Sequence, residues 1–312
     1  MFNQEIKERY IQARPASMTR EYNSYFAGSE QFENKFGKDV AEFTAPEIDE
    51  LFRSYGFLEP DTVRNRLARF SSYAAWYQEN IGGGLNCYKG YDVSTFPFAE
   101  YFNPTLIRSP ELLCNMLRQV YDADSGQPVL AALCFAWLGI ESGDAVLLRK
   151  EQVDAEHGKI FDQTGAIIVN SMPDCIRDLL YVYSKTQSAT RVQNQTFTVY
   201  AEDIGYFMKR MKSANSEKKS GPYSKAQMTV YLAELRAKFA ELYGEEAATP
   251  LNYSNVLRSG RFYRLHELAK SGVDVRSTKN ADKVRLCLGS SKRNHKDNML
   301  LYDAYLECIG EK

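Results

Sequence analysis

The segment 128–154, PVLAALCFAWLGIESGDAVLLRKEQVD, decides how the larger part of the chain folds. Residues 129–138 are apolar on nearly every side of a helix, which is typical of a helix buried at the centre of a domain. Gly139 interrupts this apolar run and Glu141 ends it, so the run is shorter than the ~18 residues that a membrane-spanning helix requires. We therefore expect the chain to fold around this helix and to have no membrane segment.

The composition indicates an ordinary cytoplasmic globular protein. The chain has 312 residues, of which 44% are hydrophobic, enough for two domains with real cores and too apolar for disorder or collagen. The first residues, MFNQEIKER, alternate in charge and lack the apolar core of a signal peptide. The six cysteines form no Cys-x-x-Cys pair and the three histidines lack ligand spacing. Neither a metal site nor a cofactor is therefore expected.

The N-terminal part is predicted to be helical over residues 1–81. Its clearest helix begins at Pro60, a favourable first-turn residue, and stops before Gly82-Gly83-Gly84. Apolar residues recur along it at spacings of three and four, at Val63, Leu67, Phe70, Ala74 and Tyr77. The composition then shifts to Gly, Pro, Tyr and Asn. We assign 1–84 to a helical N-terminal domain, 85–107 to a linker and 108–312 to a C-terminal domain.

The C-terminal domain is predicted to be mainly helical with one small sheet. Ser109 followed by Pro110 and Glu111 opens a helix. The short apolar runs 159–161 and 166–169, separated by DQTG, predict a β-hairpin. Further helices are expected at about 173–185, 201–213, 224–243, 254–271 and 296–309, with an exposed loop at 213–220. The fold class is thus mainly α with a small β-sheet, in two domains.

Positive charge is concentrated near the C-terminus although the net charge is −1. Residues 251–300 carry 11 Lys and Arg against 4 Asp and Glu, or +7, whereas residues 1–120 carry 13 against 16. Such a cluster either forms a solvated surface or follows the phosphates of a nucleic acid. The charge alone leaves both interpretations open.

Three motifs resemble the tyrosine recombinases (phage integrases). LGIESGDAVLLR at 138–149, ending in Val153-Asp154, is similar without a gap to the family segment Thr-Gly-Leu-Arg-Ile-Ser-Glu-Leu-Leu-x-Leu that ends in Ile-Asp. Arg261 stands eleven residues before Gly272-Val273-Asp274, as in the family's His-x-x-Arg helix, and Leu288-Gly289 resembles its Leu-Gly-His. The resemblance implies a two-domain clamp: a helical SAM-like core-binding domain and an integrase-like C-terminal domain.

The catalytic set that the resemblance implies is degenerate. The family's first phosphate-binding arginine falls on Glu141, a reversal of charge, while the second is retained as Arg261. The hairpin lysine falls near Gln163, and the two histidines fall on Arg258 and Ser290. A carboxylate at 141 would repel a phosphate, unless it forms a salt bridge with Arg258 or Arg261.

Tyr302 and Tyr305 are the candidate nucleophiles. They fit equally well into an apolar helical stripe with Leu301, Leu306 and Ile309. We therefore expect no catalytic residue, and no enzyme activity. The C-terminal helix that holds both tyrosines either packs within the chain or exchanges between copies on DNA, as the resemblance implies.

The resulting hypothesis is a sequence-specific protein that binds double-stranded DNA without cutting it. MFNQEIKER also resembles the N-termini of recombinase-fold repressors of SPβ-type prophages, which implies a transcriptional repressor that maintains lysogeny. The residues expected to contact DNA are Arg64, Asn65, Arg66 and Arg69 for bases, and Arg149, Arg258, Arg261, Arg264, Lys292 and Arg293 for phosphates. Two alternatives remain open: an active recombinase with a rearranged site, and a protein-interaction module without DNA binding.

Overall fold

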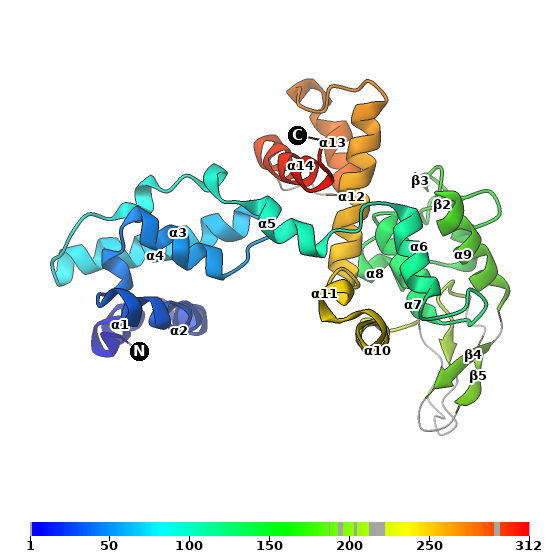
Figure 1. The fold of residues 1–312 in the computed structure, drawn as a ribbon, viewed down its shortest axis with the longest axis horizontal. Coiled ribbons are helices and arrows are strands. Elements are labelled where there is room, and N and C mark those ends of the chain that lie inside the picture. The colour runs from blue at the N-terminus through cyan, green and yellow to red at the C-terminus, as the bar shows by residue number, and fades with distance from the viewer. Residues whose placement is uncertain are drawn as a thin grey trace. The chain divides into compact units, whose positions relative to one another are not determined.

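The chain divides into two compact units. The computed structural model describes residues 2–186, 188–192, 196–202, 205–211, 222–289 and 294–311. The first unit comprises residues 1–102 with 306–308, and the second comprises residues 103–305 with 309–311 (Figure 1). Among the described residues, no helix has both the length and the apolar character that crossing a membrane would demand.

The N-terminal unit is a helical domain with an aromatic core. Thr44 and Glu47 cap one helix reciprocally, and Pro60 starts the longest one as predicted. Phe26 packs edge-on against Tyr73 with 4.7 Å between ring centres. The helices are α1 (Gln4–Gln12), α2 (Thr19–Phe36), α3 (Ala45–Ser54), α4 (Pro60–Asn80) and α5 (Phe98–Phe102), with 3-10 turns η1 (Ala16–Met18), η2 (Val40–Glu42), η3 (Cys87–Gly90) and η4 (Val93–Thr95).

The predicted linker 85–107 differs from what the structure contains. Tyr88 and Phe96 are buried, and the Tyr88 hydroxyl donates to the Val40 carbonyl at 2.7 Å. At the other end of the segment, the Ile107 amide donates to the Ser259 hydroxyl at 3.0 Å. The boundary between the units therefore falls at Phe102, because aromatic side chains in this Gly- and Pro-rich stretch pack onto the N-terminal core.

The C-terminal unit is built around the predicted buried helix. Every residue of α7 (Pro128–Trp137) is buried, which confirms that prediction. In Figure 1, α12 (Tyr253–Lys270) is flanked at one end by α10 and α11 and at the other by α13. The remaining helices are α6 (Pro110–Arg118), α8 (Ser142–Ala145), α9 (Asp174–Lys185), α10 (Lys225–Tyr243), α11 (Glu245–Ala248), α13 (Ala281–Leu288) and α14 (His295–Ile309), with 3-10 turns η5 (Asn103–Thr105), η6 (Lys150–Gln152) and η7 (Thr278–Asn280).

The predicted hairpin is confirmed as part of an antiparallel sheet. Strands β1 (Val153–Asp154), β2 (Lys159–Phe161) and β3 (Ile167–Val169) pair in that order. Val153 lies opposite Ile160, and Ile160 lies opposite Val169. The fold class is therefore mainly α with a small antiparallel sheet, in two compact units.

The predicted helix at 201–213 is wrong. Described residues there belong to β5 (Thr196–Glu202) and β6 (Arg210–Met211), and none of them is helical. β5 pairs with β4 (Ser188–Val192) on one side and with β6 on the other, in a second three-stranded sheet. The sequence TFTVYAE of β5 alternates β-branched and aromatic residues, a pattern that favours a strand over a helix. The predicted loop 213–220 lies outside the described residues.

Candidate nucleic-acid interface

Glu141 and Arg261 form an ion pair where the resemblance implies two phosphate-binding arginines. Arg261 Nη2 lies 2.6 Å from Glu141 Oε1, and the side chains are 17% and 56% exposed respectively. The expectation that Glu141 pairs with a nearby arginine is thus confirmed, with Arg261 rather than Arg258 as the partner. The pair cancels the charge at the position that would face a phosphate.

Close packing of two helices places Arg261 beside Glu141. Gly260, the residue before it, is buried against the last turn of α7. A Cβ atom on Gly260 would lie 2.0 Å from the carbonyl oxygen of Trp137, which is a backbone atom. Only glycine permits this approach of α12 to α7, and Glu141 follows α7 by four residues. The close crossing of α12 and α7 therefore fixes the position of Arg261 relative to Glu141.

Arg264 has a structural role that the sequence does not predict. Its Nη1 donates to the carbonyl of Trp137 and its Nη2 to that of Cys287 at 3.3 Å. Burial lowers the pKa of Arg264 to about 10, so it stays charged at neutral pH while its donors satisfy the ends of α7 and α13. One donor on each terminal nitrogen is thus directed to a carbonyl group within the unit, and a phosphate contact of Arg264 stays a prediction.

Of the other residues predicted to contact phosphates in this region, only Arg258 lies among the described residues. Arg258 is half-buried, and its Nη1 lies 3.3 Å from Asn255 Oδ1. Ser290, Lys292 and Arg293 lie outside the described residues. The positive stretch 251–300 also meets carboxylates from elsewhere in the chain, since Arg276 pairs with Asp303. Its +7 is therefore partly compensated in the folded unit.

The candidate nucleophiles Tyr302 and Tyr305 are buried in the C-terminal unit. The Tyr302 hydroxyl lies 3.1 Å from Nδ1 of the buried His266, and Tyr305 stacks on Phe262 with 5.8 Å between ring centres. Burial raises the pKa of both tyrosines. The structure thus places these side chains as the predicted apolar stripe does, with this part of α14 packed on α12 of its own chain.

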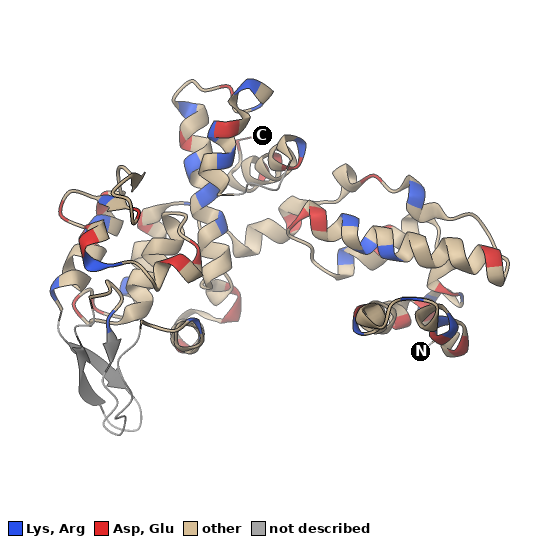
Figure 2. Cartoon of the chain, turned by 180° about the vertical axis from the view of Figure 1, so that it is seen from behind, with Lys and Arg blue, Asp and Glu red and all other residues tan. Residues whose placement is uncertain are grey.

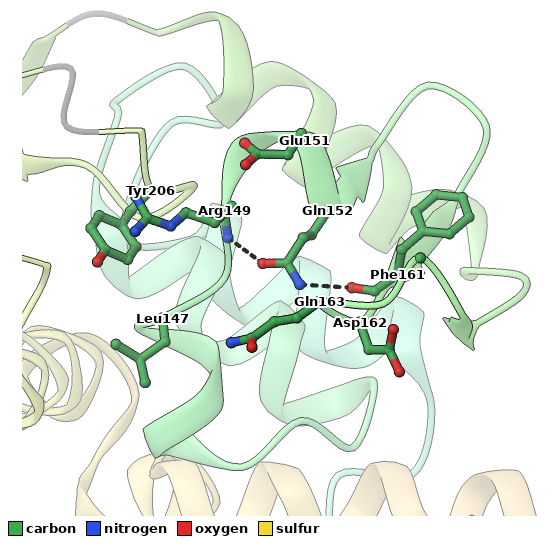
Figure 3. Close-up of a pocket in the computed structure, with 9 residues that line it drawn as sticks. Leu147, Arg149, Glu151, Gln152, Phe161, Asp162, Gln163 and Tyr206 are labelled. Carbon is green, nitrogen blue, oxygen red and sulfur yellow. Dashed lines mark hydrogen bonds between the residues drawn. The ribbon is translucent and has the colours of Figure 1, made fainter.

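Arg149 and Gln163, which the sequence does not connect, line one concave surface of about 620 Å³. Figure 3 shows Arg149 beside Tyr206, with Gln163 nearby on the β2–β3 turn. The Arg149 guanidinium lies 3.9 Å from the centre of the Tyr206 ring, a cation–π contact. Asp162 is occupied with the turn, where hydrogen bonds from Thr164 and Ala166 lower the pKa of its carboxyl group.

The ion pair opens onto a larger concavity of about 850 Å³ in the same unit. Its lining includes exposed apolar side chains: Ile167 and Ile168 are about half exposed, and Leu286 is 86% exposed. Charged and exposed apolar side chains therefore line the same concavity.

In the N-terminal unit the four predicted base-reading residues lie on α4, whose basic positions Figure 2 shows between acidic ones. Arg64 pairs with Asp61 at 3.1 Å, and Arg69 pairs with Glu21 at 3.3 Å. Asn65 is exposed. Arg64 and Arg69 therefore also have contacts within the unit, and Asn65 is the most accessible of the four for reading a base.

Arg66 packs between aromatic rings. Its guanidinium lies 4.1 Å from the ring centre of Tyr25 on α2 and 4.2 Å from that of Tyr55, which follows α3. This sandwich joins three helices through one side chain. We therefore regard Arg66 as a residue that positions α4 and thereby Asn65.

Sequence reasoning missed Arg14, which follows α1. Its guanidinium stacks over Tyr10 at 4.5 Å and its Nη2 lies 3.3 Å from the Ser72 hydroxyl of α4. The spacing of four residues between Tyr10 and Arg14 was the available signal, because residues four apart meet on one helix face.

The comparisons with known proteins agree with this two-unit organisation. Residues 1–79 match the family model described as MrpR, N-terminal core-binding domain. Over 284 residues the chain is 25% identical to the SPbeta prophage-derived uncharacterized protein YopR of Bacillus subtilis (strain 168), a match that covers 86% of this chain and 83% of that protein. The N-terminal unit is therefore similar to a recombinase-like core-binding domain, and the chain as a whole is similar to a protein of prophage origin.

Proposed function

We propose that this protein binds double-stranded DNA at specific sequences without cutting it, and that it represses transcription from a prophage. The observation that carries the proposal is the ion pair between Glu141 and Arg261. Cleavage of a phosphodiester requires fixed positive charge at the phosphate oxygens, each such donor contributing about 10²-fold or more to the rate. A carboxylate that neutralises Arg261 removes this charge from the site.

Retention of DNA binding is supported by the N-terminal unit. The match to a core-binding domain over residues 1–79 concerns the part of the chain that holds α4 and its arginines. The near-zero net charge of the whole chain, −1, fits a protein that must find few sites, because a strongly positive protein is retained by all DNA.

Replacing Glu141 with Gln tests whether the ion pair faces DNA. Glu141→Gln keeps the shape of the side chain but releases Arg261 for a phosphate, so we expect DNA affinity to rise roughly tenfold and the slope of log K against log salt to steepen by about 0.9. Glu241→Gln is the matched control, since Glu241 is exposed on α10 and the change in net charge is the same. Equal affinities for the parent and Glu141→Gln would mean that this site does not meet DNA.

A covalent-adduct assay separates the proposal from an active recombinase. The full chain is incubated with a nicked suicide duplex containing its binding site, found by genome-wide mapping of bound DNA. We expect no protein–DNA adduct, because the phosphate site lacks its charge and both candidate tyrosines are buried. An adduct that disappears in Tyr302→Phe or Tyr305→Phe would establish an active enzyme instead.

The remaining alternative, an interaction module without DNA binding, has support from the exposed apolar side chains of Ile167, Ile168 and Leu286. A gel shift with genomic fragments at low salt distinguishes it. Retention of a subset of fragments at micromolar protein supports the repressor, whereas no retention at all supports the module.

A further inference from the structure

Arg14 differs from most cations of the N-terminal unit in having no carboxylate partner among the described residues. It is half-buried, at the start of the connection between α1 and α2. Most of the other described Lys and Arg residues of this unit form ion pairs: Lys7 with Glu33, Lys35 with Glu50, Lys38 with Glu47, Arg53 with Asp49, Arg64 with Asp61, and Arg69 with Glu21.

The surroundings of Arg14 fix its orientation. The Tyr10 ring supports one face of the guanidinium at 4.5 Å, and the Ser72 hydroxyl lies 3.3 Å from Nη2. Its Nε is buried and has no hydrogen-bond acceptor in the described part of the chain. A guanidinium has five N–H donors, so most of them are left for a further acceptor. Arg14 is thus held in place and still able to bind.

A cluster of hydroxyl groups connects Arg14 with Arg69. The Tyr10 hydroxyl lies 3.1 Å from the Ser72 hydroxyl and 3.0 Å from that of Tyr22. Arg69 lies 5.9 Å from the Tyr22 ring centre and one helical turn before Ser72 on α4. Burial raises the pKa of Tyr10 to about 12, so its hydroxyl stays neutral. Arg14 therefore lies on one side of an uncharged hydroxyl cluster where α1, α2 and α4 meet, and Arg69, which pairs with Glu21, lies on the other.

This arrangement favours an anion with several oxygen atoms. Holding a partly desolvated guanidinium without a counterion is unfavourable, and an anion that occupies its free donors offsets that cost. The guanidinium fork matches two phosphate oxygens. Neutral hydroxyl groups beside it can donate to a third oxygen without repelling the charge.

We propose that Arg14 contacts a phosphate of a DNA strand at the surface formed by α1, α2 and α4, and that Ser72 and Tyr10 are the residues that position it. The inference rests on the proposed function, because it takes duplex DNA as the ligand. The inference places a contact to the DNA phosphates at the α1–α2 connection of the N-terminal unit. Base contacts stay with Asn65 on α4.

The test compares Arg14→Gln with the parent by fluorescence anisotropy, using the mapped binding site and an unrelated duplex over a salt titration. We expect affinity for both duplexes to fall roughly tenfold, and the slope of log K against log salt to decrease by about 0.9. Lys89→Gln is the matched control, because it too removes one positive charge without a carboxylate partner among the described residues, here from an exposed side chain. Lys89 lies in η3, directly after Asn86, whose side-chain amide donates to the Ser71 carbonyl of α4. Lys89 is not part of the hydroxyl cluster at Ser72, so this variant should leave binding unchanged.

Two further variants keep the proposal falsifiable if Arg14→Gln does not fold. Arg14→Lys keeps the charge but loses the stacked fork, so it should bind several-fold more weakly with an unchanged salt slope. Ser72→Ala should also weaken binding several-fold. Parental affinity in both variants would overturn the assignment.

The outcomes separate the inference from the function on which it rests. If the parent binds neither duplex, the proposed function fails. If the parent binds and folded Arg14→Gln binds equally well with the same salt slope, the inference alone fails. A loss confined to the mapped site would also overturn it, since phosphate contacts act on all sequences alike.

Discussion

Gly260→Ala is expected to destabilise the C-terminal unit by about 3 kcal/mol, as large an effect as overpacking a core usually has. The added Cβ would lie 2.0 Å from the Trp137 carbonyl oxygen and 2.8 Å from its Cα. Both are backbone atoms of the buried helix α7, so no side-chain rotation relieves the contact and α12 must move away from α7. Urea unfolding followed by circular dichroism measures the loss.

Gly90→Ala is the control for this variant. A Cβ on Gly90 meets nothing within 4 Å, so its unfolding free energy should stay within about 0.5 kcal/mol of the parent. If Gly260→Ala unfolded at the same urea concentration as the parent, this result would contradict the close approach of α12 to α7 at Gly260. The position of Arg261 against Glu141 would then lose its structural explanation.

Lys7→Met is expected to destabilise the N-terminal unit by about 3–5 kcal/mol. Lys7 Nζ lies 2.5 Å from a carboxylate oxygen of Glu33, and both side chains are fully buried. Removing the ammonium group leaves a carboxylate without its counterion in the core. The Val40 amide, which donates to Glu33 at 2.8 Å, compensates for part of the loss. Thermal and urea unfolding of the full chain report the change.

The matched control is Lys35→Met, which breaks an exposed pair with Glu50 and should cost less than about 1 kcal/mol. The double variant Lys7→Met/Glu33→Met should be more stable than Lys7→Met alone, since it leaves no charge buried. Equal stability of Lys7→Met and Lys35→Met would contradict the buried pair. DNA binding should weaken in Lys7→Met near its melting temperature, because α1 carries Tyr10 and leads to Arg14.

Local pattern was sufficient for the elements that carry the fold. The apolar run of α7 determines a buried helix, and the turn residues between β2 and β3 determine a hairpin. Each signal lies within a few consecutive residues, so both elements could be predicted. The pairing of Glu141 with one of two arginines, Arg258 or Arg261, was also predictable, because the resemblance places these residues at one phosphate site and opposite charges attract; the choice of Arg261 came from the structure. Burial of Tyr302 and Tyr305 followed from the apolar stripe of their helix.

The direction of long side chains could not be predicted. Arg264 and Arg66 increase the count of positive residues in their segments, yet one satisfies two carbonyl groups and the other lies between two rings. Whether an arginine points to solvent or folds back depends on residues far away in sequence. The same reason hid Arg14, whose partner Ser72 is 58 residues away.

The two tryptophans of the chain give each unit its own optical reporter. Trp137 is buried at the end of α7, where its carbonyl accepts from Arg264. Trp76 lies on α4, half-buried, with its ring centre 5.3 Å from that of Tyr10. Intrinsic fluorescence therefore contains one signal from the core of the C-terminal unit and one from the surface next to Arg14. Single-tryptophan variants would resolve the unfolding of each unit and the arrival of DNA at that surface without any attached label.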